Sequence, residues 1–191
     1  MQQTKSMVND VLSVASYLSG DDLSEELLID FWVKDTDPLG DGSSEESFTN
    51  CFYKSRAIKE SIKLLIDYSI FSEENGKLKF HKLSQKVMQI IYGRSNLFEE
   101  YHQKLVKWIL PKLKFDIDKQ DYEEINKVSK FISHGFSLLE FENEKLDEEY
   151  LAELLSRIGE HQQQTGNYIK AKECFKKVFY ITEKHFGKDH S

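Results

Sequence analysis

The fold of this chain is decided by residues 155–178, which read LSRIGEHQQQTGNYIKAKECFKKV. Gly159 and Ala171 supply small side chains where two helices must approach closely, and Gly166-Asn167 predicts a tight turn between them. The apolar positions that would interlock across this helical hairpin are Leu155, Ile158, Phe175 and Val178. One such hairpin cannot bury its apolar face alone. The pattern therefore predicts the first unit of a stacked array, with a successor expected after Ser191, and it favours binding over catalysis.

The composition is that of a largely helical protein outside the membrane. Of the 191 residues, 39% are hydrophobic and 31% are charged, and the two prolines leave room for long helices. No apolar run approaches the ~20 residues that a membrane-spanning helix needs, and the polar N-terminus lacks the apolar core of a secretion signal. Cys51 and Cys174 lie far apart with no CxxC spacing, which favours a reducing compartment. We interpret the protein as cytoplasmic.

Charge is distributed unevenly along the chain. Residues 19–49 carry ten acidic side chains against the single base Lys34, whereas residues 50–94 carry nine bases against four acids. The formal net charge of the whole chain is −7. An acidic segment beside a basic one can fold onto it or onto a third partner, although solvated helix faces account for most such charges.

The first 93 residues predict helices followed by a β-hairpin. Apolar residues recur at helical spacing in the first three segments, and Asn75-Gly76 is a strong hairpin signal between two short strands. This order of elements describes a winged-helix module. The expected elements are helices from residue 8 to 18, from Asp22 or Ser24 to Trp32, from 54 to 68 and from 83 to 92, strands at 69–72 and 77–81, and a polar loop at 35–47.

Two further amphipathic helices are expected before the stacking hairpin, at about residues 97–113 and 122–141. The chain is therefore predicted to be mainly α, with a winged-helix domain at 1–93, a helical linker at 94–147 and a hairpin unit at 148–191.

The hairpin unit resembles a tetratricopeptide repeat of the longer kind found in kinesin light chains. The positions that fall in the family register are Leu155, Ile158, Gly159, Tyr168, Ala171, Phe175 and Val178. Gln162 departs from the pattern, because the family usually places an aromatic residue there, and this departure suits a terminal repeat. The resemblance implies that the array binds a protein or peptide.

The segments 64–71 and 78–87, together with the upstream stretch 15–28, are similar to the winged-helix region of STAND-type, NB-ARC-like signalling NTPases with C-terminal tetratricopeptide repeats. In that family a histidine after the second wing strand reaches the phosphates of a nucleotide held by a P-loop domain. The matching position is His81. A purely local strand-ending role is the alternative. The chain contains no GxxxxGK[ST] motif, so ADP or ATP is expected only where a P-loop domain is present in cis or in trans.

The sequence offers no catalytic constellation. Its six histidines show neither HExxH nor paired-metal spacing, and no GxSxG occurs. Cys174 is expected to pack and not to act as a nucleophile. We therefore expect a non-catalytic regulatory or scaffold segment of a signalling switch. Its expected partners are a protein or peptide on the repeat surface and a nucleotide-binding domain against the winged helix, with no membrane partner and no metal.

An alternative from another class is a winged-helix DNA-binding regulator with a protein-binding helical tail. Arg56, Lys59 and Lys63 recur on one face of the would-be recognition helix, and Lys77 and Lys79 lie on the wing, so this surface could contact phosphates. The adjacent acidic segment and the negative net charge weigh against this alternative, as does the shortage of side chains suited to base reading.

Overall fold

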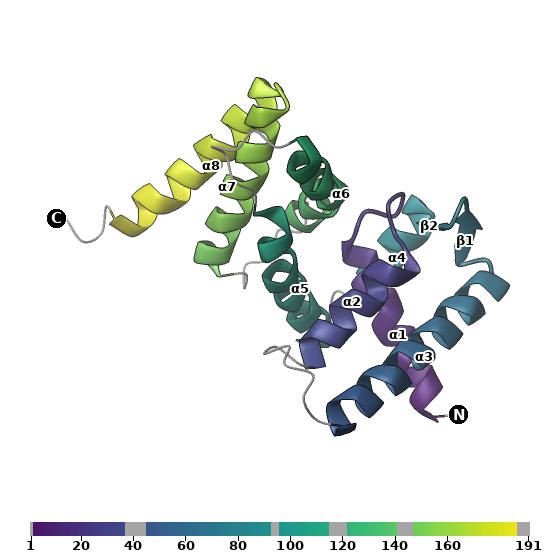
Figure 1. Cartoon of the computed structure of the whole chain (residues 1–191). Coiled ribbons are helices and arrows are strands. Elements are labelled where there is room, and N and C mark those ends of the chain that lie inside the picture. The colour runs from purple at the N-terminus through teal and green to yellow at the C-terminus, as the bar shows by residue number, and fades with distance from the viewer. Residues whose placement is uncertain (1, 37–44, 93–95, 115–121, 141–146, 187–191) are drawn as a thin grey trace. The chain divides into compact units, whose positions relative to one another are not determined.

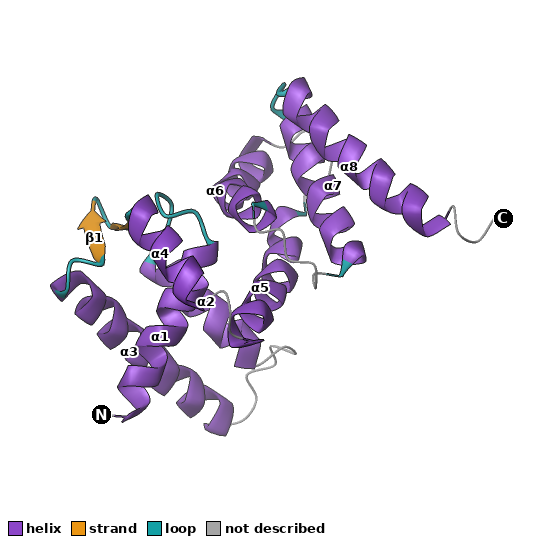
Figure 2. Ribbon diagram, turned by 180° about the vertical axis from the view of Figure 1, so that it is seen from behind, coloured by secondary structure: helices purple, strands orange, loops and turns teal. Residues whose placement is uncertain are grey.

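The computed structural model describes residues 2–36, 45–92, 96–114, 122–140 and 147–186. Within these ranges the chain is 81% helical, with eight α-helices and one two-stranded antiparallel hairpin (Figures 1 and 2). The predicted mainly helical fold with a single β-hairpin is confirmed. The chain divides into two compact units, Met1–Trp108 and Ile109–Ser191. No helix among the described residues is both long enough and apolar enough to cross a membrane.

The first unit contains α1 (Gln2–Tyr17), α2 (Glu25–Thr36), α3 (Glu45–Asp67), β1 (Phe71–Glu74), β2 (Lys77–Phe80), α4 (Lys82–Tyr92) and most of α5 (Asn96–Ile109). Helix α3 packs against α1 and α2, and α4 packs against α1. Its core combines side chains from α1, α2, α3, both strands and α5, whereas no residue described in α4 is buried. The core includes Val11, Leu18, Leu28, Phe31, Ile58, Leu65, Phe71, Leu78, Phe80 and Leu105. The indole of Trp108 donates to Asp30 Oδ2 at 3.1 Å, which ties α5 to α2.

Several predicted boundaries in this unit are wrong. Helix α1 begins at Gln2 and not at residue 8, and α2 continues to Thr36, beyond Trp32. Helix α3 begins at Glu45 and not at about residue 54, so its first turns fall inside the loop expected at 35–47; residues 37–44 lie outside the described part. The first strand begins at Phe71 and not at residue 69. Ser69 adopts φ 57° and ends α3, with the Ser69 and Ile70 amides donating to the carbonyls of Ile66 and Leu65. This Schellman arrangement leaves Ser69 unable to start a strand.

The β-hairpin has the register that its turn sequence predicts. Phe71 pairs with Phe80 and Glu74 pairs with Lys77, and Asn75 and Gly76 both have positive φ, at 52° and 74°. These values fit the type I′ turn that Asn-Gly favours. Strand β2 also hydrogen-bonds to the segment that follows α1. The Leu78 and Phe80 amides donate to the carbonyls of Leu23 and Gly20, each at 3.0 Å.

The second unit contains a 3₁₀ turn (Leu110–Leu113), α6 (Tyr122–Leu139), α7 (Glu148–Gln164) and α8 (Tyr168–Phe186). The helix predicted at 97–113 is α-helical to Ile109 and continues as the 3₁₀ turn. Pro111 lies at the start of this turn and has no amide hydrogen to donate to an α-helical bond. Helix α7 packs against α8 on one side and against α6 and the 3₁₀ turn on another. The three-part division at residues 93 and 147 stays a prediction, because residues 93–95 and 141–146 lie outside the described ranges.

Candidate functional site

The helical hairpin α7–α8 is held together at a point of close approach. Asp147 caps α7 by accepting from the Glu149 amide at 3.0 Å, and Gly166 takes φ 78° in the turn before α8. Gly159 faces α8 so closely that a Cβ on it would lie 2.9 Å from the Phe175 ring and 3.2 Å from Cys174 Cβ. Only a residue without a side chain fits there without displacing its neighbours.

The expected packing residues of the hairpin fall into two groups. Leu155, Ile158, Gly159 and Ala171 are buried, whereas Tyr168 is 69% exposed, Phe175 is 37% exposed and Val178 is half-buried. Gly159 faces Phe175 and Cys174 of α8, whereas Ile158 packs against Gly135 of α6. Tyr168 and Phe175 are exposed at the edge of α8, and the Phe175 ring also faces Gly159 of α7.

An apolar groove lies along one edge of the α7–α8 hairpin, mostly on α8. Its volume is about 470 Å³, and it is lined by Tyr168, Ala171, Phe175 and Phe179, with Gln163, Lys172 and Lys176 beside them. Phe179 is 66% exposed. An open aromatic groove along a helical hairpin marks a surface that another apolar element can cover.

A second groove of about 850 Å³ opens between α6 and α8 and is more polar. Phe136, Leu139 and Leu155 contribute apolar surface, while Ser133, Ser137, Glu140, Lys170, Glu173 and Lys177 contribute polar groups. Lys170 Nζ lies 5.4 Å from the centre of the Phe136 ring. Cys174 also lines this groove, and burial raises the pKa of its thiol, with Lys177 opposing the rise. A protonated, buried thiol is suited to packing and not to nucleophilic attack.

His161 is buried in the contact between α7 and α6. Its Nε2 lies 2.8 Å from Ser129 Oγ, and the Ser129 hydroxyl in turn donates to the Ile125 carbonyl at 2.8 Å. Burial lowers the pKa of His161, while a hydrogen bond with the Ile125 backbone opposes the shift. The imidazole is therefore held in its neutral form, as a structural part of the α6–α7 contact.

His81 lies between β2 and α4 and is exposed. Its Nδ1 accepts from the Leu83 amide at 3.2 Å, and its carbonyl accepts from the Gln85 amide at 2.9 Å, so the residue caps the start of α4. His81 therefore makes local hydrogen bonds of the kind that the alternative, strand-ending role would involve. Because Nδ1 accepts, the neutral ring carries its proton on Nε2, and that nitrogen can donate to an incoming acceptor such as a phosphate oxygen.

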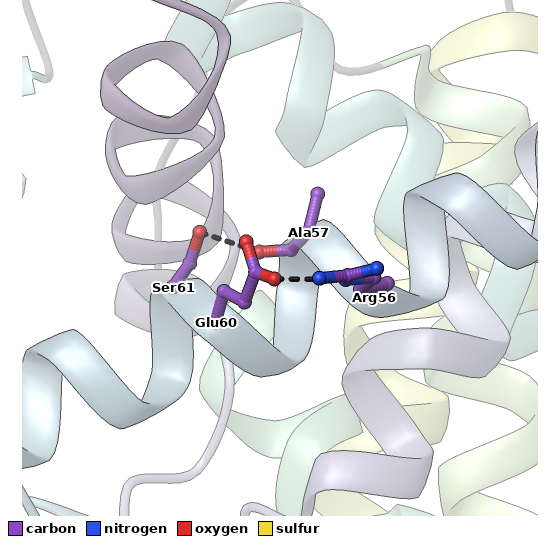
Figure 3. Close-up of polar contacts among 4 residues, drawn as sticks. All are labelled: Arg56, Ala57, Glu60 and Ser61. Atoms are coloured by element: carbon purple, nitrogen blue, oxygen red, sulfur yellow. Dashed lines mark hydrogen bonds and ion pairs between the residues drawn. The ribbon is translucent and has the colours of Figure 1, made fainter. Parts of the chain in front are cut away.

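The five cations of the would-be nucleic-acid surface are exposed, but four of them face carboxylates. Arg56 Nε lies 2.9 Å from Glu60 Oε1 on the same helix (Figure 3), and Lys59 Nζ lies 3.0 Å from Glu25 Oε1. Lys77 pairs with Asp22 at 3.3 Å, and Lys79 pairs with Glu74. The hydrogen bond and charge of Glu74 raise the pKa of Lys79. The fifth residue, Lys63, is exposed on α3.

Three features of the site could not be read from the sequence. Gln85 Nε2 donates to the carbonyls of Ser16 and Leu18 at 2.9 and 2.5 Å, and Gln89 Nε2 donates to Ser16 at 2.7 Å. These two side chains cap the end of α1 from 67 or more residues away in the sequence. Gly135 lets α6 approach α7, because a Cβ there would lie 3.0 Å from Ile158 Cδ1. Finally, α4 directs its aliphatic residues outward.

No cluster of three or more potential metal ligands occurs among the described residues. Comparison with protein-family models, with curated proteins and with solved structures found no match to this chain.

Proposed function

We propose that this chain is a non-catalytic regulatory and scaffold segment that binds a protein partner through the α7–α8 hairpin, acting as a tetratricopeptide-like repeat. The observation that carries the proposal is the asymmetry of this hairpin. Helix α6 and the 3₁₀ turn cover one side of α7, whereas α8, together with Gln163 of α7, leaves the apolar groove of Tyr168, Phe175 and Phe179 open. Stacked helical repeats bury such a side against the next unit.

The experiment that tests this proposal adds a neighbouring repeat unit. An idealised tetratricopeptide hairpin with a terminal helix is fused after residue 186, and hydrogen exchange of the α8 amides is followed by mass spectrometry. We expect exchange in α8 to slow by about tenfold or more, since neighbouring repeats stabilise one another. In a Phe179→Glu version of the fusion this protection should be lost. Unchanged exchange in the fusion would contradict the stacking role of α8.

We further propose that α1–α4 and the β-hairpin form a winged-helix module of a STAND-type switch. The support is the order of the elements and the position of His81, whose Nε2 is available at the end of β2. Where a P-loop domain is present in cis or in trans, His81 would donate to a nucleotide phosphate and stabilise the resting state. His81→Leu should then shorten ADP retention, and Lys63→Leu serves as the exposed control. Equal ADP retention in the wild type and His81→Leu would remove this role.

The alternative of duplex binding has less support, because Arg56, Lys59, Lys77 and Lys79 already face carboxylates. Phosphates would have to displace those acids. A titration of duplex DNA across a salt series distinguishes the scaffold function from DNA binding, because phosphate contacts make log affinity fall steeply with log salt. We expect no measurable binding at low salt. A slope that corresponds to the release of several counterions would favour DNA binding.

A further inference from the structure

Helix α4 directs its glutamine side chains toward α1 and its aliphatic side chains outward. The side-chain amides of Gln85 and Gln89 cap the end of α1. Leu83, Ile90 and Ile91 are 67%, 70% and 59% exposed. A surface helix of a globular protein usually buries its apolar stripe and exposes its polar residues. In α4 the need to satisfy the carbonyls at the end of α1 has reversed this arrangement.

The outward residues of α4 form one continuous stripe. Leu83, Val87, Ile90 and Ile91 are separated by four, three and one residues, which places them on one side of an α-helix over two turns. Val87 is also exposed, at 43%. Scattered exposed aliphatic residues need no explanation, but a contiguous stripe marks a docking surface. Its ridge is suited to packing beside another helix.

The charges beside this stripe define the chemistry of the occupant. Lys82 and Lys86, one turn apart, are exposed along one edge of the stripe, and the sequence of α4 contains neither Asp nor Glu. A second copy of α4 would therefore bring no carboxylate to these lysines. An anionic lipid surface is disfavoured by the net charge of −7 of the whole chain. A partner helix with carboxylates along one edge satisfies both the stripe and the lysines.

We propose that the outward face of α4 docks an amphipathic helix of a partner protein, with an apolar stripe edged by Asp or Glu residues one turn apart. This surface is distinct from the α8 groove and does not depend on the repeat function proposed for it. The lysine edge sets the orientation of the incoming helix, and the aliphatic stripe supplies most of the affinity.

The test uses the full chain and two synthetic amphipathic peptides of about 20 residues, long enough to form a helix. The peptides share one leucine stripe and differ only in carrying Glu or Lys along its edge. Binding is measured by fluorescence anisotropy at ~0.15 M salt, where the net charge of −7 is screened beyond ~8 Å and the charges next to the peptide dominate. We expect the Glu peptide to bind about three- to tenfold more tightly than the Lys peptide, as two exposed ion pairs allow.

Three variants separate this face from the rest of the molecule. Lys86→Glu should abolish or reverse the preference for the Glu peptide, and Ile90→Glu should weaken binding of both peptides by about tenfold or more. Phe179→Glu, in the α8 groove, should leave both affinities unchanged. Both α4 positions are exposed, so the thermal unfolding midpoints should match that of the wild type. If Ile90→Glu nevertheless unfolds, the charge reversal at Lys86 decides the question.

Several results would overturn the assignment. The two peptides could bind equally, or binding could survive Ile90→Glu in a folded protein. Sedimentation could reveal a dimer that Ile90→Glu dissociates, which would make a second copy the occupant. Binding to phosphatidylserine vesicles that Ile90→Glu removes would make the occupant a membrane surface.

Discussion

The close approach of α7 and α8 at Gly159 predicts that the smallest possible side chain destabilises the hairpin. In Gly159→Ala two effects oppose one another. Alanine favours a helix interior over glycine by ~1 kcal/mol. Its Cβ, however, would lie 2.9 Å from the Phe175 ring and 3.2 Å from Cys174 Cβ, and such overpacking costs ~1–3 kcal/mol.

The two contacts differ in their ability to yield. The Phe175 ring is the far end of a side chain that is 37% exposed, so it can move outward, whereas Cys174 Cβ is buried and fixed to the α8 backbone. We therefore expect overpacking to exceed the gain in helix propensity, with a net loss of ~1 kcal/mol for Gly159→Ala and ~3 kcal/mol for Gly159→Leu.

Native-state hydrogen exchange of the α7 and α8 amides measures this loss locally, which avoids assuming that both units unfold together. The matched control is a double-mutant cycle with Phe175→Leu, which removes the ring that the new methyl group meets. The Gly159→Ala penalty should shrink in part in the Phe175→Leu background, because the contact with Cys174 Cβ remains there. If Gly159→Ala instead stabilises the hairpin by the full ~1 kcal/mol of helix propensity, and the cycle shows no coupling, the close approach is refuted.

Three other predictions follow from single contacts. Gln85→Glu places a carboxylate against the Leu18 carbonyl in place of a donating amide, so we expect urea unfolding to show a loss of ~2 kcal/mol, larger than that of Gln85→Ala. Because burial lowers the pKa of His161, the unfolded chain takes up the proton first as pH falls below ~6.5. Stability of the second unit should therefore be complete above that pH and decline as pH falls toward the lowered pKa, and a His161→Gln variant should lack this step in pH-dependent unfolding. Gly20→Ala would bring a Cβ within 2.4 Å of the Phe80 carbonyl oxygen, and the resulting loss of ~2–3 kcal/mol should appear as faster exchange of the Phe80 amide.

The local elements of this protein could be predicted from sequence because their signals are local. Apolar spacing indicated the helices, and Asn75-Gly76 indicated a hairpin turn whose positive φ values the structure contains. The predicted boundaries of β1 and of the helix at 97–113 were wrong because short-range interactions that apolar spacing does not report end the preceding element there. Ser69 closes α3 through backbone hydrogen bonds and delays β1, and Pro111 begins a 3₁₀ turn.

The candidate surfaces divide in the same way. The sequence of the hairpin indicated which residues are small and which are apolar, but it could not distinguish the buried Ala171 from the exposed Tyr168. The cations Arg56 and Lys59 looked available in the sequence, and the structure places carboxylates against both. The partner of Arg56 is Glu60, four residues further along the same helix, whereas the partner of Lys59 is Glu25 of another helix, which is distant in the sequence.

The sequence by itself determined the helical periodicity, the hairpin turn and the lack of a P-loop motif, because each depends on residues a few positions apart. Only the tertiary structure decided which side of each helix is covered. Gln85 belongs to the polar side of α4, yet it faces inward because the carbonyls at the end of α1 need donors. That long-range hydrogen bonding leaves the aliphatic stripe of α4 exposed, and no local pattern in the sequence reports it.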